Sequence, residues 1–181
     1  MIDGLIPNRY AKALYKYALD KGTTDDVYQL AKTVISSFRE NPGLQKVLAN
    51  PFVKGADKEK LLVAAAGQRA DETYRRFVGL IIAHHREAFA YMMMLSYREI
   101  YRDAHNISQV EIVTAANLGD DEMKKMKGLV EKAFPGRVFE YTTKVNPDLI
   151  GGFIIDVDSV RMDASISNEL EQLRLNLIRS N

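Results

Sequence analysis

The hydrophobic pattern of this 181-residue chain changes its period near residue 105. From Val27 to Phe38, apolar side chains recur every three or four positions, which is the spacing of an amphipathic helix. From Gln109 to Ala115, apolar and polar side chains alternate, which is typical of a half-buried strand. We therefore predict two domains, a helical one over residues 1–105 and a small α/β domain over residues 106–181.

Turn signals divide the first half into about six helical segments. The first helix is expected to begin near Arg9 and to end at Gly22, because glycine tolerates the left-handed conformation that closes a helix. Two Asn-Pro pairs, at Asn41 and Asn50, mark the boundaries of the third helix, and Asp71 caps a later one. Short loops between helices are typical of bundles, so the first domain is predicted to be a six-helix bundle.

The second half has the pattern of a short mixed sheet with two helices. The most apolar strand is expected from Leu149 to Val157 and is placed at the centre of the sheet, with Val160 to Met162 as a short hairpin partner. Leucines at helical spacing after Ser165 predict a helix at the C-terminus. The predicted fold class is therefore α+β, with the helical bundle first and the small α/β domain second.

No group of residues has the composition of a catalytic or cofactor site. Cysteine is absent, which excludes disulfides, thiolate metal ligands and a cysteine nucleophile. His84 and His85 are adjacent, so on a helix they point about 100° apart and cannot share one metal ion. The Gly151-Gly152 pair lacks the spacing of a phosphate-binding loop and indicates a strand that is bent or closely approached. We expect no enzyme activity, no metal site and no cofactor.

Charge and hydropathy restrict the partners. The formal net charge is +1 and the lysines are scattered, so no nucleic acid is expected as a ligand. The sequence has no run of about 18 apolar residues that could span a membrane, and Met1 to Tyr10 lacks the apolar region of a signal peptide. Any membrane association is therefore expected to be indirect, through a protein partner.

Two helical segments are more apolar than a surface helix requires. Between Arg9 and Lys21 the polar side chains occupy an arc of only roughly 80°, and the segment from Phe77 to Ala83 is apolar on nearly every face. Either these helices are central in the bundle, or they border a groove that accepts an amphipathic partner helix. We expect such a groove to be lined by Tyr10, Ala13 and Tyr17 on the first helix and by Phe77, Leu80, Ile81 and His84 on the second.

Three segments resemble the ATP synthase delta subunit family, which includes the mitochondrial oligomycin-sensitivity-conferring protein. Pro7 to Leu14 is similar to the R-P-Y-A-x-A opening of that family, and Asn50-Pro51-Phe52 is similar to its N-P-x segment. The most specific resemblance is an apolar strand with a glycine pair, followed by D-x-S-I and a leucine helix. Its signature residues here are Gly151, Gly152, Asp163 and Ser165.

Two residues depart from the pattern of the family. Asn8 stands where the family often has proline, and Asp158 stands where many members have glycine in the turn after the strand. The second departure bears on the geometry of the hairpin. Neither position touches a catalytic role, since the family has none.

The resemblance implies a non-catalytic stator subunit of the F-type ATP synthase. In this interpretation the N-terminal bundle binds the catalytic hexamer by accepting the N-terminal helix of an alpha subunit in its groove. The C-terminal domain binds the C-terminal region of the b subunits in the peripheral stalk. The protein would then be a peripheral component at the cytoplasmic face of the bacterial cell membrane. The alternative is a helical-bundle adaptor that binds an amphipathic peptide or nucleic acid.

The purified protein is predicted to hydrolyse no nucleotide by itself, because its sequence contains no recognisable catalytic constellation. Steady-state hydrolysis assays with ATP, on protein freed of contaminating ATPases, check this. Saturable turnover that co-elutes with the protein through gel filtration would contradict the prediction.

Overall fold

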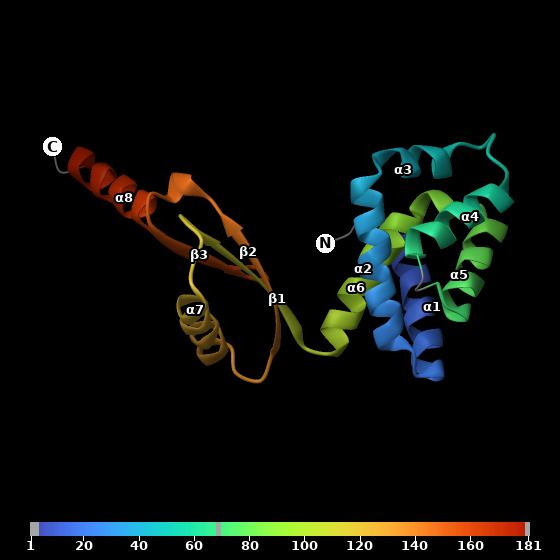
Figure 1. Cartoon of the computed structure of the whole chain (residues 1–181), viewed down its shortest axis with the longest axis horizontal. Coiled ribbons are helices and arrows are strands. Elements are labelled where there is room, and N and C mark those ends of the chain that lie inside the picture. Colours follow the sequence, from blue (N-terminus) through green and yellow to red (C-terminus); the bar gives the residue numbers. More distant parts are fainter. Residues whose placement is uncertain (1–3, 68–69, 180–181) are drawn as a thin grey trace. The chain divides into compact units, whose positions relative to one another are not determined.

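The computed structural model describes residues 4–67 and 70–179, and the chain divides into two compact units, the first ending at Ala104 and the second beginning at His105 (Figure 1). The described part of the first unit contains six α-helices and one short 3-10 helix. In chain order these are α1 (Leu5–Lys21), α2 (Thr24–Glu40), α3 (Pro42–Ala49), α4 (Gly55–Ala66), α5 (Glu72–Ala83), η2 (Glu87–Phe89) and α6 (Ala90–Ala104).

Helix α6 packs against both α1 and α2 and supplies much of the core of the helical unit. Tyr97 of α6 is fully buried, and its hydroxyl donates a hydrogen bond to the carbonyl of Thr24 at 3.1 Å. Tyr101 stacks on Tyr28 of α2 with ring centroids 4.0 Å apart, and its hydroxyl donates to the carboxylate of Asp25 at 2.7 Å. Ring stacking and hydroxyl hydrogen bonds therefore fix α6 against the first half of α2.

Local signals in the sequence set several helix ends. Gly22 adopts a left-handed conformation with φ of 68° and closes α1, as expected. The side chain of Asp71 accepts a hydrogen bond from the backbone N–H of Tyr74 at 2.8 Å and caps α5. Helix α1 begins at Leu5 and not near Arg9, because Pro7 falls in the first turn, where backbone N–H groups have no partner within the helix.

The second unit contains a mixed sheet whose described strands lie in the order β2-β1-β3-β4. Strand β1 pairs in parallel with β2 and antiparallel with β3, and β3 pairs antiparallel with β4. Helix α7 connects β1 to β2, and its Val130 joins Val110, Ile112, Ile155 and Val157 in one apolar core. The bounds are β1 (Ile107–Thr114), α7 (Asp120–Ala133), β2 (Val138–Val145), η3 (Pro147–Leu149), β3 (Gly152–Val157), β4 (Val160–Ser165) and α8 (Ile166–Arg179).

The expected α+β class with a mixed sheet is confirmed, and two strand boundaries differ from the prediction. The strand expected from Leu149 begins only at Gly152, because the side chain of Asn146 accepts from the N–H of Asp148 at 3.1 Å and starts a 3-10 turn. The hairpin partner expected to end at Met162 continues to Ser165, where it pairs with Gly152. The strand pairing is therefore longer than the short hairpin that was expected.

A buried ion pair joins α4 to η2. Lys58 Nζ lies 2.6 Å from Glu87 Oε1, and the two side chains are only 5% and 10% exposed. Burial alone would raise the pKa of Glu87, but the hydrogen bond and positive charge of Lys58 oppose it, and the pKa is lowered from its ordinary value. This contact anchors α4 to the segment that leads into α6.

Lys58→Met is predicted to lower the free energy of unfolding by about 3–5 kcal/mol, because it leaves a buried carboxylate without its partner. The double variant Lys58→Met/Glu87→Leu should recover most of this loss, since no buried charge remains. Urea denaturation at pH 7 measures both changes. A single variant as stable as the double variant would contradict the role of the pair.

The pH dependence follows from the lowered pKa of Glu87. Because the folded-state pKa lies below the unfolded one, the pair stabilises the protein above the ordinary glutamate pKa, and this contribution is lost as the pH falls through the lowered value. The advantage of the wild type over the double variant should therefore shrink below about pH 4. Denaturation curves of both proteins at pH 7 and pH 3 test the sign.

Candidate protein-binding surfaces

An open groove lies between α1 and α5 on the helical unit, with a volume of about 440 Å³. Its apolar surface comes mainly from α1 and from Leu80 of α5, which is 44% exposed. Arg9, His84 and Arg86 add cationic or titratable groups to the wall. The full lining is Leu5, Ile6, Arg9, Tyr10, Ala13, Leu80, His84 and Arg86.

The structure brings four of the seven expected groove residues together: Tyr10, Ala13, Leu80 and His84. Tyr17 lies one turn beyond Ala13, and its hydroxyl accepts a hydrogen bond from Arg76 of α5 at 3.2 Å. Phe77 and Ile81 do not line the groove, since they are 6% and 1% exposed and belong to the core.

The expected stripe on α5 was too wide, because Phe77 and Ile81 face inward whereas Leu80 and His84 face outward. Leu5 and Ile6 were missed because the helix was expected to begin later. Arg86 was missed because it follows the end of α5.

The neighbouring helices cover only part of the apolar surface of α1. Its fully buried residues are Pro7, Ala11, Leu14 and Ala18, which occupy a single face. Leu5 on the flank is 90% exposed, and Tyr10 is half-buried. An exposed apolar flank beside a concave surface is typical of a site that accepts a partner helix.

The four signature residues meet where β4 joins α8. Gly152 has φ of 74°, and a Cβ added there would lie 2.1 Å from the carbonyl oxygen of Ala164, so only glycine fits between β3 and β4. A Cβ on Gly151 would lie 2.5 Å from Cδ1 of Ile166, the first residue of α8. The N–H of Ile166 also donates to the carbonyl of Gly151 at 3.1 Å. The glycine pair therefore holds the start of α8 against the start of β3.

Asp163 and Ser165 form the cap of α8. The hydroxyl and the N–H of Ser165 both donate to Asp163 Oδ1, at 2.6 and 2.9 Å, and these bonds lower the pKa of the Asp163 carboxyl. The Ser165 hydroxyl in turn accepts from the N–H of Asn168 at 3.2 Å, as an N-cap residue does. The four signature residues thus have a structural role, because they fix the direction in which α8 leaves the sheet.

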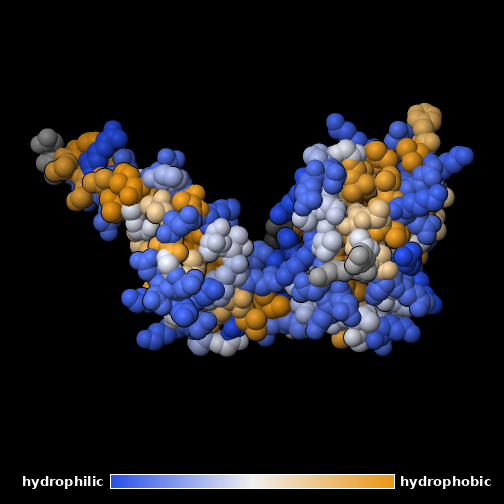
Figure 2. Space-filling view, in the orientation of Figure 1, coloured by the Kyte–Doolittle hydropathy of each residue, from blue (hydrophilic) through white to orange (hydrophobic). Residues whose placement is uncertain are grey.

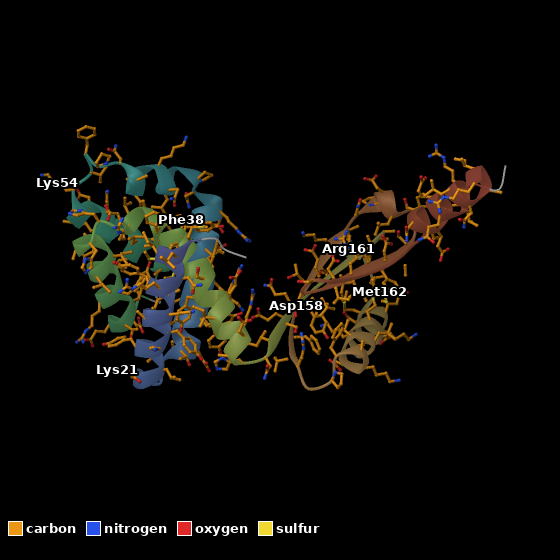
Figure 3. All side chains as sticks on the ribbon, turned by 180° about the vertical axis from the view of Figure 1, so that it is seen from behind. Lys21, Phe38, Lys54, Asp158, Arg161 and Met162 are labelled. Carbon is orange, nitrogen blue, oxygen red and sulfur yellow. The ribbon has the colours of Figure 1, made fainter. Side chains whose placement is uncertain are left out.

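Asp158, where many family members have glycine, has φ of 50° in the turn between β3 and β4 (Figure 3). Aspartate tolerates this left-handed conformation better than most residues. Its carboxylate accepts from the N–H of Gln109 at 2.9 Å and from Arg137 at 3.0 Å. These bonds tie the turn to the start of β1, so the substitution keeps the hairpin geometry and adds contacts that glycine lacks.

Helix α8 has no buried residue along its 14 positions. Its exposed apolar side chains gather on the surface in Figure 2, and they include Leu170 and Leu177, at 52% and 70% exposure. Most of them recur every three or four residues, as apolar residues do where one helix packs against another. They are Ile166, Leu170, Leu173, Leu177 and Ile178.

A second apolar hollow, of about 430 Å³, lies beside α7 on one face of the sheet. Met162 of β4 lines it, whereas its neighbour Arg161 lies on the opposite face and pairs with Asp156 at 2.7 Å (Figure 3). This ion pair lowers the pKa of Asp156, mainly through the hydrogen bond from Arg161. The apolar lining continues through Leu129, Val130, Ala133, Phe134, Phe153, Ile155, Val157 and Val160.

Within residues 4–67 and 70–179, no three His, Cys, Asp or Glu side chains are grouped so that they could hold a metal ion. Among the same residues, no helix is both long enough and apolar enough to cross a membrane. The groove between α1 and α5, the hollow beside α7 and the exposed face of α8 are apolar patches, and such patches often mark sites that bind another protein.

Comparison with known proteins gives one consistent result. A model of the family described as ATP synthase delta (OSCP) subunit matches residues 6–177. The ATP synthase subunit delta of Phocaeicola vulgatus is 38% identical over 182 residues, covering 100% of this chain and 98% of that protein. The subunit delta of Parabacteroides distasonis is 36% identical over 177 residues, covering 98% of each.

A chain in the cryo-EM structure of the Toxoplasma gondii mitochondrial ATP synthase hexamer has a similar fold, with a TM-score of 0.70. The similarity covers 97% of this chain and 98% of that one, at 17% sequence identity. Nearly the whole chain therefore shares its fold with a component of that assembly.

Gly152→Ala is predicted to destabilise the second unit by about 3 kcal/mol, since it combines a left-handed backbone with a clash against backbone atoms. Gly136→Ala is the matched control, because Gly136 has φ of 80° but nothing within 4 Å of an added Cβ. That variant should cost only about 1 kcal/mol. Hydrogen exchange of peptides from the second unit measures both, and equal effects would contradict the close approach.

Proposed function

The chain belongs to the ATP synthase delta (OSCP) subunit family and is a stator subunit of the F-type ATP synthase, and we propose that it joins the catalytic hexamer to the peripheral stalk through two separate surfaces. The family match over residues 6–177 is the observation that carries this conclusion. It spans both units, so each unit is expected to contribute one attachment.

The first attachment is the groove between α1 and α5. We propose that the helical unit acts as a six-helix bundle and accepts the amphipathic N-terminal helix of an alpha subunit. Tyr10, Ala13 and Leu80 would contact the apolar face of that helix. The small side chain of Ala13 would allow the backbone of the partner to approach closely, as small residues do where helices cross.

The second attachment is the exposed apolar face of α8. The C-terminal region of the b subunits would pack along Leu170, Leu173 and Leu177, which are all exposed. Apolar residues at three- and four-residue spacing are the pattern on which one helix packs against another. The capped junction at Ser165 would hold this helix in a defined direction while it is under load.

We propose that such a stator subunit acts by binding its partners and catalyses no reaction. Proton flow turns the rotor, and the catalytic hexamer would turn with it unless a static connection opposes the torque. The chain would supply that connection and contribute no catalytic group of its own. We propose that it is held at the cytoplasmic face of the bacterial cell membrane by its partner subunits.

Ala13→Asp is predicted to weaken binding of the alpha subunit's N-terminal peptide by at least about 2 kcal/mol, because it places an unpaired charge in the apolar contact. Isothermal titration of the full chain with a peptide from the same organism's alpha subunit measures this. Ala56→Asp, which is exposed on α4 away from the groove, is the control and should bind as the wild type does.

Thermal melts accompany the titration. Ala13 is exposed in the free protein, so the variant should unfold near the wild-type temperature. Unchanged affinity would contradict the proposal that the groove binds this peptide. A large loss of thermal stability would show that this face of α1 belongs to the core.

A further inference from the structure

We infer that two copies of this chain associate through their second units, each placing its helix α8 in the hollow beside α7 of the other. The hollow is lined by residues of α7, β3 and β4, and α8 carries exposed apolar side chains along its length. The occupant of the hollow is therefore the C-terminal helix of a second copy. The inference goes beyond the proposed function and does not depend on it.

The helix layer on the α7 face of the sheet is incomplete. A helix is about 10 Å across and neighbouring strands lie about 4.8 Å apart, so one helix covers about two of the four described strands. Lys127 of α7 lies over the ring of Tyr141 on β2 at 4.9 Å, and Val130 packs on β1 and β3. The hollow lies on the other flank of α7, over β3 and β4. A second helix beside α7 would complete this layer.

The hollow is apolar from its floor to its rim. Val130, Ile155 and Val157 form the floor, and each is 3% exposed. At the rim, Leu129 of α7 is 51% exposed and Met162 of β4 is 46% exposed. All the described lining residues are apolar, so the hollow fits the apolar face of a helix, whereas a charged ligand would lose its hydration there.

Helix α8 has an apolar stripe that matches the hollow. Leu170, Leu173 and Leu177 lie within an arc of about 60° on a regular helix and are 52%, 59% and 70% exposed. The 14 residues of α8 span about 21 Å, and the six residues of β4 span about 20 Å. The stripe can therefore run along the full length of the strand that borders the hollow.

The helix cannot reach the hollow of its own chain. Ser165, the last residue of β4, is followed directly by Ile166, the first residue of α8, whereas a helix that folds back on its sheet usually follows a loop of about 2–6 residues. The Ser165 cap and the hydrogen bond from Ile166 to Gly151 also hold this junction. Helix α8 consequently leaves the sheet at the end away from α7 (Figure 1 and Figure 3).

A two-fold axis would let both copies make this contact at once, since exchange of an identical element is a common route to a closed dimer. Each copy would contribute the nine described lining residues of its hollow and the three leucines of its stripe. Standard interfaces use about 20–30 residues on each side, so this interface is small. We therefore expect a concentration-dependent equilibrium with a dissociation constant in the micromolar range.

Sedimentation velocity of the full chain measures this association. The average mass should rise from 20.5 kDa towards twice that value as the protein concentration increases through the micromolar range. Leu173→Glu and Met162→Glu should each raise the dissociation constant at least about tenfold, because each places a carboxylate in the apolar contact. Both side chains are exposed in the single chain, so circular dichroism should show that both variants fold.

Each variant has a matched control. Leu175→Glu puts the same charge on α8 at a residue that is 43% exposed and points about 180° away from the stripe. Val145→Glu puts it on β2 at a residue that is 48% exposed and lies outside the lining of the hollow. Both controls should associate as the wild type does.

A mixture of the two interface variants tests the exchange itself. In a mixed pair, the intact α8 of the Met162→Glu chain can enter the intact hollow of the Leu173→Glu chain. Neither variant alone can form an intact contact. When one of the two chains carries a fluorescent label, the mixture should therefore associate more tightly than either variant does with itself, and less tightly than the wild type.

Three results would overturn the inference. The first is a wild-type chain that sediments at 20.5 kDa at every concentration. The second is association that Leu173→Glu abolishes and Met162→Glu leaves unchanged, which would mean that α8 pairs with α8 instead. The third is a mixture that associates no better than the separate variants.

Discussion

The packing of α1 on α6 determines which surface of the helical unit remains open. The residues that α1 buries are mostly small, and Ala11, Leu14 and Ala18 lie on one face. Small side chains at a helix contact allow the two axes to lie close together, which fixes the rotation of α1 about its own axis. Tyr10 and Ala13 are thereby turned outward beside Leu80 of α5. The groove thus follows from an apolar surface on α1 that is larger than its neighbours can cover.

A comparable constraint operates in the second unit, at the backbone of Gly152. The approach of 2.1 Å between an added Cβ and the Ala164 carbonyl means that β3 and β4 meet more closely than any side chain would allow. The same contact region places Ile166 against Gly151 and starts α8 in a fixed direction. A helix without buried residues would otherwise be oriented only by its covalent attachment, so the cap at Ser165 and the glycine pair define its path.

The sequence predicted the class and order of the elements because periodicity and turn residues are local signals, as the closure of α1 at Gly22 illustrates. It predicted the groove residues less well. Phe77 and Ile81 are as apolar as Leu80, and only the rotation of α5 against its neighbours decides which of them is buried. Arg86 carried no periodic signal because it lies beyond the helix end. The start of β3 was predicted too early, because the turn that Asn146 initiates takes up the first residues of the apolar run from Leu149.

The two surfaces that we propose as attachment sites lie in different units, and each is positioned by elements of its own unit. Helix α6 packs on α1, which borders the groove, and two residues separate its last residue, Ala104, from Ile107, where β1 begins. Strand β1 is an interior strand that pairs with β3, and β3 begins at the glycine pair that holds α8. Within each unit, packed helices or a strand ladder therefore hold the proposed surface in place. A subunit that opposes torque requires this, because an attachment site on a mobile segment would yield under load.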